Sequence, residues 1–372
     1  MSDIGILWKL IEDGRKGKNI GTSTGLSKLD KLIGGIQDSR YYLISSQSSG
    51  GKTSLVLFFM YQMLRNSTDP VYFIYYSLEL GSEILLAKLM ALYCAEEFGI
   101  YLTTNNVLSF DSILTDENYE YLRKAKEWIQ SIEDRLIIFD SGLSARILYK
   151  TTIPILQKLG KIEKIDGREI YIPNNPNQKV IGVIDHALLL KLEEGRKIKE
   201  EIDLTSSYMV TLKRKYRISW FMIMQQNRES SSMDRRKADL SEPGLNDIMA
   251  SSAPVNDSDV TLQIFYPARE KLSTCRGYKI LGENGGGLRD TYRGLIISKN
   301  RYGIANQVLN CGFYGSVGWW TELPLPEQIT DIKLIREPSL NIPCKTKRII
   351  QQDLSENDID KKIIRTNTEY TF

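Results

Sequence analysis

The sequence is poor in the residues that mark secreted, zinc-binding or membrane proteins. Its 372 residues include four cysteines, which lie far apart and show no C-x-x-C spacing. This arrangement argues against a disulfide framework and against a zinc site, and it fits a reducing compartment. No long uncharged apolar run occurs, because Lys88 interrupts the best candidate, and no signal-peptide core is evident at the start. These absences predict a cytoplasmic protein with no membrane partner.

Charge of one sign is also scarce. The formal net charge is +3, which is too small to name a class of partner, since a nucleic-acid binder needs its positive charge gathered locally. Hydrophobic residues make up 42% of the chain and charged residues 26%, which is typical of a globular protein with a sizeable core. A chain of this length holds one large domain or two of ordinary size.

Strand-like apolar runs alternate with helical periodicity along the chain. Strands are expected at 41–45, 71–76, 136–140, 180–185, 220–224, 260–266, 295–299 and 308–314, and helices at 52–65, 82–98, 117–131 and 204–217. Alternation followed by a run of strands predicts an α/β fold. In this fold a mostly parallel central sheet is flanked by helices, and antiparallel strands are added at one edge.

Four segments stand outside this alternation. Residues 1–20 read as a short arm or linker helix, and residues 331–372 as a polar, mobile tail. Residues 161–173 alternate around an Asp-Gly pair, which predicts a hairpin insertion. Residues 268–289 are polar and contain three consecutive glycines, which predicts a flexible loop.

The most informative stretch follows the first expected strand and matches G-x-x-x-x-G-K-[ST], except that Ser46 replaces the first glycine. It comprises Ser46, Gln47, Ser48, Ser49, Gly50, Gly51, Lys52, Thr53 and Ser54. In such a loop, backbone N–H groups converge on phosphate oxygens, the lysine reaches the β- and γ-phosphates, and the threonine hydroxyl binds Mg²⁺. The alternative is a plain Ser/Gly-rich turn, but Gly-Lys-Thr between a strand and a helix favours a site for nucleotide and Mg²⁺.

A phosphate loop needs a second anchor for the metal, and a carboxylate at the end of a neighbouring strand supplies it. Asp185 ends the run 180–185 and is the better candidate, while Asp140 ends a run of the same form. Hydrolysis also needs a group that orients water. The residue after Asp185 is His186, the only histidine, so Glu79 at the end of the run 71–76 becomes the candidate base.

Two further strand ends complete the candidate site. Gln225 follows the run 220–224, where its amide would sense the γ-phosphate. Lys299 ends the run 295–299, and Arg301 follows it. A basic pair of this kind is usually solvated, and it is informative only where a second subunit places its nucleotide opposite, since an arginine can then stabilise transition-state charge in trans.

In this order the residues resemble the C-terminal motor domain of DnaB-type replicative helicases, from Ser23 to about Leu323. The quoted motifs are Thr24-Gly25-Leu26-Ser27-Lys28-Leu29-Asp30, Ser77-Leu78-Glu79-Leu80, Ile184-Asp185, Gln225-Gln226-Asn227-Arg228, Asp257-Ser258-Asp259 and Lys299-Asn300-Arg301. The resemblance implies a RecA-like ATPase domain at 21–330 that uses ATP and Mg²⁺. It makes Glu79 the catalytic base and Gln225 the γ-phosphate sensor, and it implies that Lys299 and Arg301 reach a neighbouring subunit's nucleotide.

The same resemblance implies single-stranded DNA as substrate, self-assembly into a ring that is expected to be a hexamer, and a primase or helicase loader as candidate partners. The chain departs from the family at the DNA-binding loop, where Met249 stands in place of an arginine. Contacts to DNA would then come from Ser251, Ser252 or basic loops. The basic candidates are Arg196, Lys197, Lys199, Arg235, Arg236 and Lys237, whereas 213–215 reads as the solvent face of a helix.

The family's N-terminal collar domain has no counterpart in this sequence, and only the arm at 1–20 precedes the ATPase domain. We therefore expect an ATP-driven helicase of the DnaB type. Two alternatives are a RecA-like DNA-dependent ATPase without unwinding activity, such as a recombination mediator or loader, and a nucleotide-binding scaffold without activity. Lys52, Thr53, Glu79 and Arg301 weigh against the scaffold.

Overall fold

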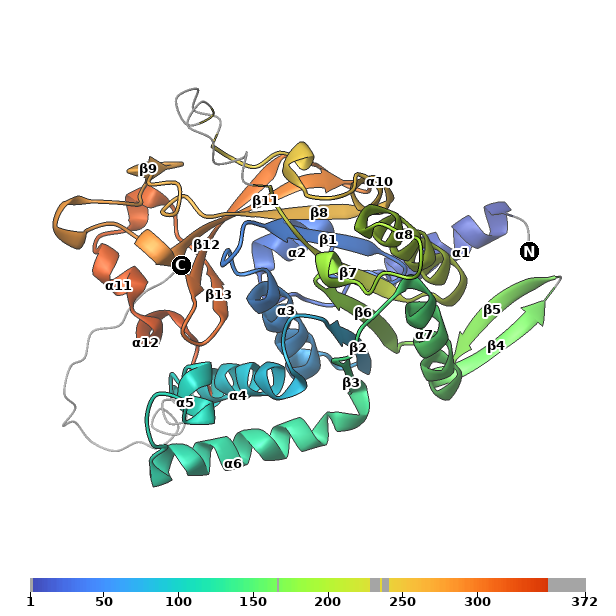
Figure 1. Ribbon diagram of the computed structural model, residues 1–372, viewed down its shortest axis with the longest axis horizontal. Coiled ribbons are helices and arrows are strands. Elements are labelled where there is room, and N and C mark those ends of the chain that lie inside the picture. Colours follow the sequence, from blue (N-terminus) through green and yellow to red (C-terminus); the bar gives the residue numbers. More distant parts are fainter. Residues whose placement is uncertain (1–2, 166, 228–234, 236–240, 347–372) are drawn as a thin grey trace.

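The computed structural model describes residues 3–165, 167–227, 235 and 241–346 (Figure 1). Its centre is a sheet with the order β13-β12-β11-β8-β1-β7-β6-β2-β3. The strands are β1 (Tyr41–Ser46), β2 (Val71–Ser77), β3 (Leu136–Phe139), β6 (Lys179–Asp185), β7 (Ser219–Gln225), β8 (Val260–Phe265), β11 (Tyr292–Asn300), β12 (Gln307–Tyr314) and β13 (Trp319–Glu322). From β8 to β3 the neighbours are parallel, while β11, β12 and β13 are antiparallel additions at one edge. The predicted fold class is confirmed.

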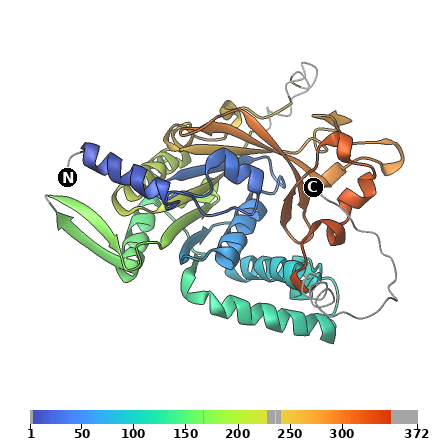
Figure 2. The same cartoon turned by 180° about the vertical axis from the view of Figure 1, so that it is seen from behind.

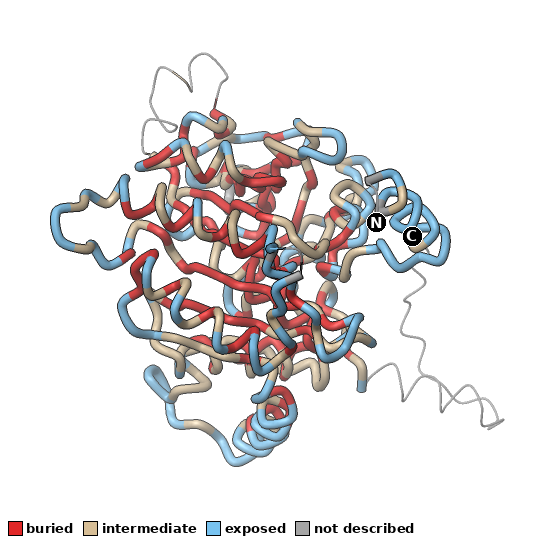
Figure 3. The backbone as a smooth tube through the Cα atoms, turned by 90° about the vertical axis from the view of Figure 1, so that its right-hand side faces the viewer, coloured by how far each residue is buried: buried red, intermediate tan, exposed pale blue. Residues whose placement is uncertain are grey.

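Helices cover both faces of the sheet, and strand alternation decides which side chain meets which helix. Tyr42 and Ile44 of β1 pack in the core that contains α3 (Lys52–Asn66) and α4 (Ser82–Phe98). Tyr41 and Leu43 point to the other face and pack with α7 (Ala145–Leu159) and α8 (Ile198–Tyr216). Successive side chains of a strand face opposite sides, and a parallel strand covered on both sides is apolar throughout. Figure 3 shows these buried strands in the middle of the molecule.

Smaller elements surround this sandwich. They are α2 (Ser27–Ile33), α5 (Thr104–Leu108), α6 (Asp116–Ser131) and α10 (Ala253–Asp257), with α11 (Ile332–Arg336) and α12 (Pro338–Asn341) near the end of the described chain. The expected helices at 52–65, 82–98, 117–131 and 204–217 are all present, and α8 begins six residues earlier than expected. In the described part of the chain no helix has the length and apolar character needed to cross a membrane.

Two projections extend from the same side of the molecule (Figure 2). One is α1 (Asp3–Arg15), whose Leu7, Trp8 and Leu10 are at least half exposed. The other is the antiparallel hairpin of β4 (Gly160–Ile165) and β5 (Arg168–Pro173), which confirms the hairpin predicted from the Asp-Gly pair. Asp166 itself lies outside the described residues.

The segment 268–289 is folded, so the prediction of a flexible loop is wrong. It contains the short pair β9 (Thr274–Cys275) and β10 (Tyr278–Lys279), and Tyr278, Ile280 and Leu288 are buried with Tyr292 in a small apolar cluster. The polar composition hid these apolar residues, because they are spaced between charged and glycine positions and carry no regular period.

The beginning of the predicted tail is also folded. Helices α11 and α12 lie against the sheet edge, Tyr314 donates its hydroxyl hydrogen bond to the Ile335 carbonyl at 2.8 Å, and Ile342 is buried. The division into arm, ATPase domain and tail stays a prediction, and residues 347–372 lie outside the described residues.

The sheet packs most tightly where Gly182 of β6 lies beside Trp220 of β7. A methyl group at Gly182 would overlap the Trp220 ring, which is fully buried. We expect Gly182→Ala to lower the free energy of unfolding by about 1–3 kcal/mol, because overpacking forces a rigid aromatic ring to move. Urea denaturation followed by tryptophan fluorescence measures the change. Gly294→Ala in β11 is the control, since its methyl would meet Phe265 at an ordinary 3.6 Å, and equal losses in both variants would contradict the prediction.

Candidate nucleotide-binding site

The carboxyl ends of the parallel strands gather most of the predicted site residues at one edge of the sheet. Ser46 at the end of β1 pairs with Gln225 at the end of β7, and Ser77 at the end of β2 pairs with Asp185 at the end of β6. Glu79 follows Ser77 by two residues. Polar groups from four strands therefore meet at the edge where ligands bind in open α/β sheets.

The loop between β1 and α3 has the backbone that its sequence predicts. Ser49 has φ 60° and Gly51 has φ 105°, and a side chain at Gly51 would lie 2.9 Å from the Trp320 ring. Only glycine fits such a position without strain. Helix α3 begins at Lys52, so its unpaired N–H groups and positive end lie at the loop.

Lys52 folds over the loop that precedes it. Its Nζ donates to the carbonyl oxygens of Gln47 at 3.2 Å and Ser46 at 3.4 Å. Burial lowers the pKa of Lys52, and the carboxylates of Asp185 and Glu79 oppose that shift. Across the loop, the Gln225 amide donates to the Ser48 hydroxyl at 2.7 Å. Ser54 lies in the first turn of α3, after Thr53.

Asp185 is a buried carboxylate that fits a metal ligand. Its side chain accepts a hydrogen bond from the Tyr75 hydroxyl at 2.8 Å, while Oδ1 is buried with no hydrogen-bond partner among the described residues. Burial raises the pKa of Asp185 to about 6, against the opposing effects of Tyr75 and Thr53. No group of three or more His, Cys, Asp or Glu that could hold a metal occurs in the described parts of the chain. Mg²⁺ would fit here because it is commonly held by one carboxylate, a hydroxyl and phosphate oxygens.

Glu79 lies near Asp185, on the side that is open to solvent. About half of its side chain is exposed, and its Oε2 lies 3.7 Å from Nε2 of His186. Burial lowers the pKa of His186, so the imidazole is neutral near pH 7 and Glu79 is not held in a strong ion pair. The rival carboxylate Asp140 is exposed at the end of β3, which is the edge strand beyond β2. Three strands separate it from the loop strand β1.

Lys299 and Arg301 lie at the side of the sheet where the parallel strands begin, whereas the phosphate loop of the same chain lies where these strands end. Because β11 is antiparallel to β8, Asn300 pairs with Val260, at the start of the parallel strands. Lys299 donates to the Val255 carbonyl at 2.6 Å, and Arg301 lies 3.5 Å from Asp259. The pair is separated from the loop by the length of a six-residue strand. At a rise of about 3.3 Å per residue this length is about 20 Å. The two basic residues therefore do not reach the phosphate loop of their own chain.

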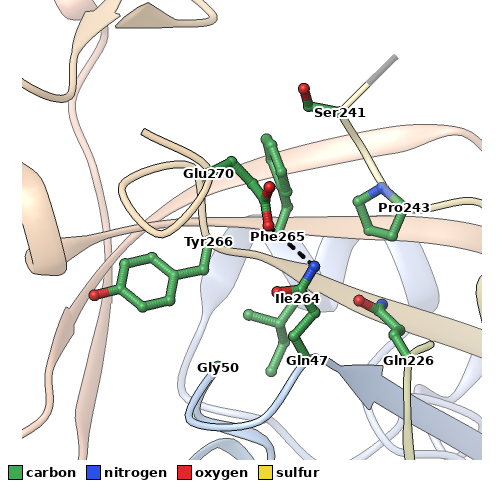
Figure 4. Close-up of a pocket in the computed structure, with 9 residues that line it drawn as sticks. All are labelled: Gln47, Gly50, Gln226, Ser241, Pro243, Ile264, Phe265, Tyr266 and Glu270. Atoms are coloured by element: carbon green, nitrogen blue, oxygen red, sulfur yellow. Dashed lines mark hydrogen bonds between the residues drawn. The ribbon is translucent and has the colours of Figure 1, made fainter. Parts of the chain in front are cut away.

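Three residues that the sequence did not single out contact the loop: Arg269, Glu270 and Arg293. Arg269 donates to the Ser48 carbonyl, and Arg293 donates from Nε to the Gly50 carbonyl at 3.1 Å. Glu270 accepts from the Gln47 amide at 3.0 Å, as Figure 4 shows in the small pocket behind the loop. No local pattern marks them, because β11 and the turn after β8 meet the loop only in the folded sheet.

Three of the candidate DNA contacts are bound to acidic side chains of this chain. Arg196 pairs with Glu193 and Glu201, Arg235 pairs with Asp247, and the Ser251 hydroxyl donates to Asp203. Lys197 caps α8 and Lys199 lies in its first turn, so the loop expected at 196–199 ends at Lys197. Ser252 is exposed at the start of α10, while Arg236 and Lys237, like Arg228 of the quoted motif, lie outside the described residues.

The assignment of Lys213 to a solvent face is wrong. This side chain is buried and forms an ion pair with the buried Asp259 at 2.6 Å. Asp259 also accepts from the Tyr41 backbone N–H at 2.8 Å, so the pair joins α8, β1 and β8. A run of three basic residues on a helix is usually solvated, and only the fold shows that one of the three turns inward.

Comparison with known proteins agrees with this geometry. Residues 21–317 match the family described as DnaB-like helicase C terminal domain. The chain belongs to this family. The curated relatives include the replicative DNA helicase DnaB of Helicobacter pylori strain J99, which is 24% identical over 262 residues, or 69% of this chain and 46% of that protein. The chain therefore spans about half the length of the curated relatives it matches.

Solved structures show the same fold. An ATPase domain matches with a TM-score of 0.67 and 20% identity, over 87% of this chain and 99% of that one. A DnaB-like replicative helicase, described with its interactions with primase, matches with a TM-score of 0.65 and 20% identity, over 87% of this chain and 67% of that one. The DnaB-like chain thus has the expected RecA-like architecture.

Asp185 should destabilise the DnaB-like domain when no cation is present. We expect Asp185→Asn to raise the stability of the metal-free protein at pH 8 by about 1–3 kcal/mol, because it removes a buried charge. The difference should grow as pH rises from 3.8, the ordinary pKa, to about 6, the folded pKa, and stay constant above that.

Thermal melts across this pH range measure the effect. Asp140→Asn is the control, because Asp140 is exposed at a strand end of the same form, and its melting temperature should not change. Addition of Mg²⁺ with ATP should stabilise the wild type more than Asp185→Asn, which keeps the phosphate loop but loses a metal ligand. A metal-free variant less stable than the wild type at pH 8 would refute the prediction.

Proposed function

We propose that the chain is an ATP-dependent DNA helicase that moves on single-stranded DNA as a ring and unwinds duplex during replication. One observation carries the proposal. The phosphate loop, Glu79, Asp185 and Gln225 lie at one edge of the sheet, and Lys299 and Arg301 at the other. A complete site then requires two subunits, placed so that one edge faces the opposite edge of the next. Head-to-tail contacts of this kind form a ring when the rotation between subunits closes and a helical filament when it does not, and we propose a closed ring with a hexamer as the expected number.

Each residue has a defined task in hydrolysis. Lys52 and the N–H groups of the loop bind the phosphates, and Thr53 and Asp185 would hold Mg²⁺, which neutralises phosphate charge. Glu79 accepts a proton from the attacking water and orients it, while Gln225 contacts the γ-phosphate through the amide that here binds Ser48. Arg301 and Lys299 of the next subunit stabilise the charge that develops on the transferred phosphoryl group.

Single-stranded DNA is the proposed substrate, and the contacts are assigned to loops that face the ring's channel. Among the described candidates, Lys197, Lys199 and Ser252 remain exposed. A primase or a helicase loader is a proposed partner, and the cytoplasm the proposed location. Of the alternatives, a non-unwinding recombination mediator or loader has no observation in its favour beyond the shared fold. Unwinding of a forked duplex with ATP separates it from a helicase.

Glu79 can be tested as the catalytic base. Glu79→Gln keeps the size of the side chain but cannot take a proton, so we expect the ATPase rate to fall by about 10²–10⁴-fold while nucleotide binding is kept. The assay is DNA-stimulated ATP turnover, with binding of a fluorescent nucleotide measured in parallel. Glu83→Gln, in the first turn of α4 and exposed, is the matched control and should behave as the wild type. Unchanged turnover in Glu79→Gln would sink the assignment.

The shared site predicts that two inactive variants rescue each other. Lys52→Ala removes the loop contact and Arg301→Ala the contact in trans, and each alone should be inactive. Mixed rings bring the intact loop of one variant to the intact arginine of the other, so about a quarter of the interfaces regain both groups. The measurement is the ATPase activity of the two single variants after they are mixed and their subunits exchange. The control is a mixture of the double variant Lys52→Ala/Arg301→Ala with the wild type. No recovery in the mixture would show that the site is not shared.

A further inference from the structure

The phosphate loop is held from its outer side by two guanidinium groups. Arg293 donates from Nε to the Gly50 carbonyl at 3.1 Å, and Arg269 donates to the Ser48 carbonyl. Arg293 comes from the start of the antiparallel strand β11, and Arg269 from the turn after the parallel strand β8 beside it. Figure 4 shows the same turn beside the loop, with Gln47 bound to Glu270.

Arg293 is a buried cation with an unusual set of partners. Only 3% of the residue is exposed, and its Nη1 donates to the carbonyls of Asp290 at 2.7 Å and Tyr292 at 2.8 Å. Its guanidinium lies 3.5 Å from the centre of the Tyr266 ring. None of the ion pairs in the described chain includes Arg293. Burial lowers the pKa of Arg293 to about 10. Tyr266 and the charge of Asp290 oppose this shift, and an anion beside the loop would stabilise the buried guanidinium further.

Peptide geometry links these carbonyl contacts to phosphate binding. In a trans peptide the carbonyl of one residue and the N–H of the next point in opposite directions within one plane. A Gly50 carbonyl fixed on Arg293 therefore turns the Gly51 N–H away from that side. In the same way the Ser48 carbonyl on Arg269 sets the direction of the Ser49 N–H. Phosphate loops bind anions with such N–H groups, so their direction decides affinity.

We propose that Arg293 is a positioning residue that holds the Gly50 carbonyl so that the Gly51 N–H faces the phosphates of a nucleoside triphosphate. Arg269 acts in the same way at Ser48 and Ser49. The inference rests on the proposed nucleotide site, and it adds two groups that neither contact the substrate nor take part in the proton transfer. Their positive charge also favours an anion beside the loop.

The test compares nucleotide binding in three variants. Arg293→Met removes the donor and the charge but keeps an unbranched chain beside Tyr266, and Arg293→Lys keeps the charge. Arg276→Met is the control, since the guanidinium of Arg276 is bound to the Glu242 carboxylate and not to a carbonyl of the phosphate loop. We expect Arg293→Met to weaken binding of a fluorescent ATP analogue with Mg²⁺ by about 10-fold or more, because it removes a charge-assisted hydrogen bond.

The pattern across variants distinguishes positioning from a purely structural role. Arg293→Lys should recover part of the affinity, Arg276→Met should bind as the wild type, and KM for ATP should rise more than kcat falls. Arg269→Met changes an exposed residue, so it can test the inference even if Arg293→Met fails to fold. We expect Arg269→Met to bind the ATP analogue about 3-fold more weakly than the wild type. Wild-type affinity in a folded Arg293→Met, or in Arg269→Met where Arg293→Met does not fold, would overturn the inference.

Failure of the proposed nucleotide site gives a different result. In that case the wild type does not bind the analogue, or Lys52→Ala binds it as tightly as the wild type. If the wild type binds, Lys52→Ala does not, and Arg293→Met matches the wild type, then only the positioning role is wrong.

Discussion

The double pairing of β1 is the constraint on which the rest of this structure depends. β1 lies between β7 and β8, and every one of its residues is buried. Because its faces alternate, Tyr42 and Ile44 fix α3 on one side while Tyr41 and Leu43 fix α8 on the other. The end of β1 therefore has one possible position, and the phosphate loop begins there. Gln225 and Asp185 reach that loop only because β7 and β6 follow β1 in register.

The buried charges of the molecule mark the places where packing alone does not explain the residue. Asp185 lies at the loop edge with an unpartnered oxygen, and Arg293 holds the loop from behind. Asp259 and Lys213 form a buried pair at the opposite edge, beside Arg301. Each costs stability relative to an apolar residue. These charges lie at the two sides of the sheet that would form the proposed shared site. The proposed function therefore explains why residues that lower stability occur there.

Local periodicity predicts eight of the nine strands of the main sheet and the helices α3, α4, α6 and α8, because a parallel strand covered on both faces is apolar along its length and α3 and α4 carry long buried runs. It also placed Glu79, Asp185 and Gln225 at strand ends, which a parallel sheet must gather at one edge. It did not predict α7 or β13. It failed where a contact joins distant segments. Lys213 turns inward because Asp259 follows α10, Arg293 reaches Gly50 across 243 positions, and the apolar cluster of 268–289 forms only against Tyr292.

The antiparallel edge strands connect the two halves of the proposed site. β11 starts beside the loop, where Arg293 binds Gly50, and ends at the far edge with Lys299 and Arg301. In the proposed ring, β11 thus runs from one subunit's own nucleotide site to the groups offered to its neighbour, with a register shift between Ile297 and Lys299. A strand paired on both sides, to β8 and β12, moves as a unit with the sheet. In the proposed ring, a shift of the loop that Arg293 follows would displace Arg301 relative to the next subunit, so β11 offers a physical route between successive proposed sites.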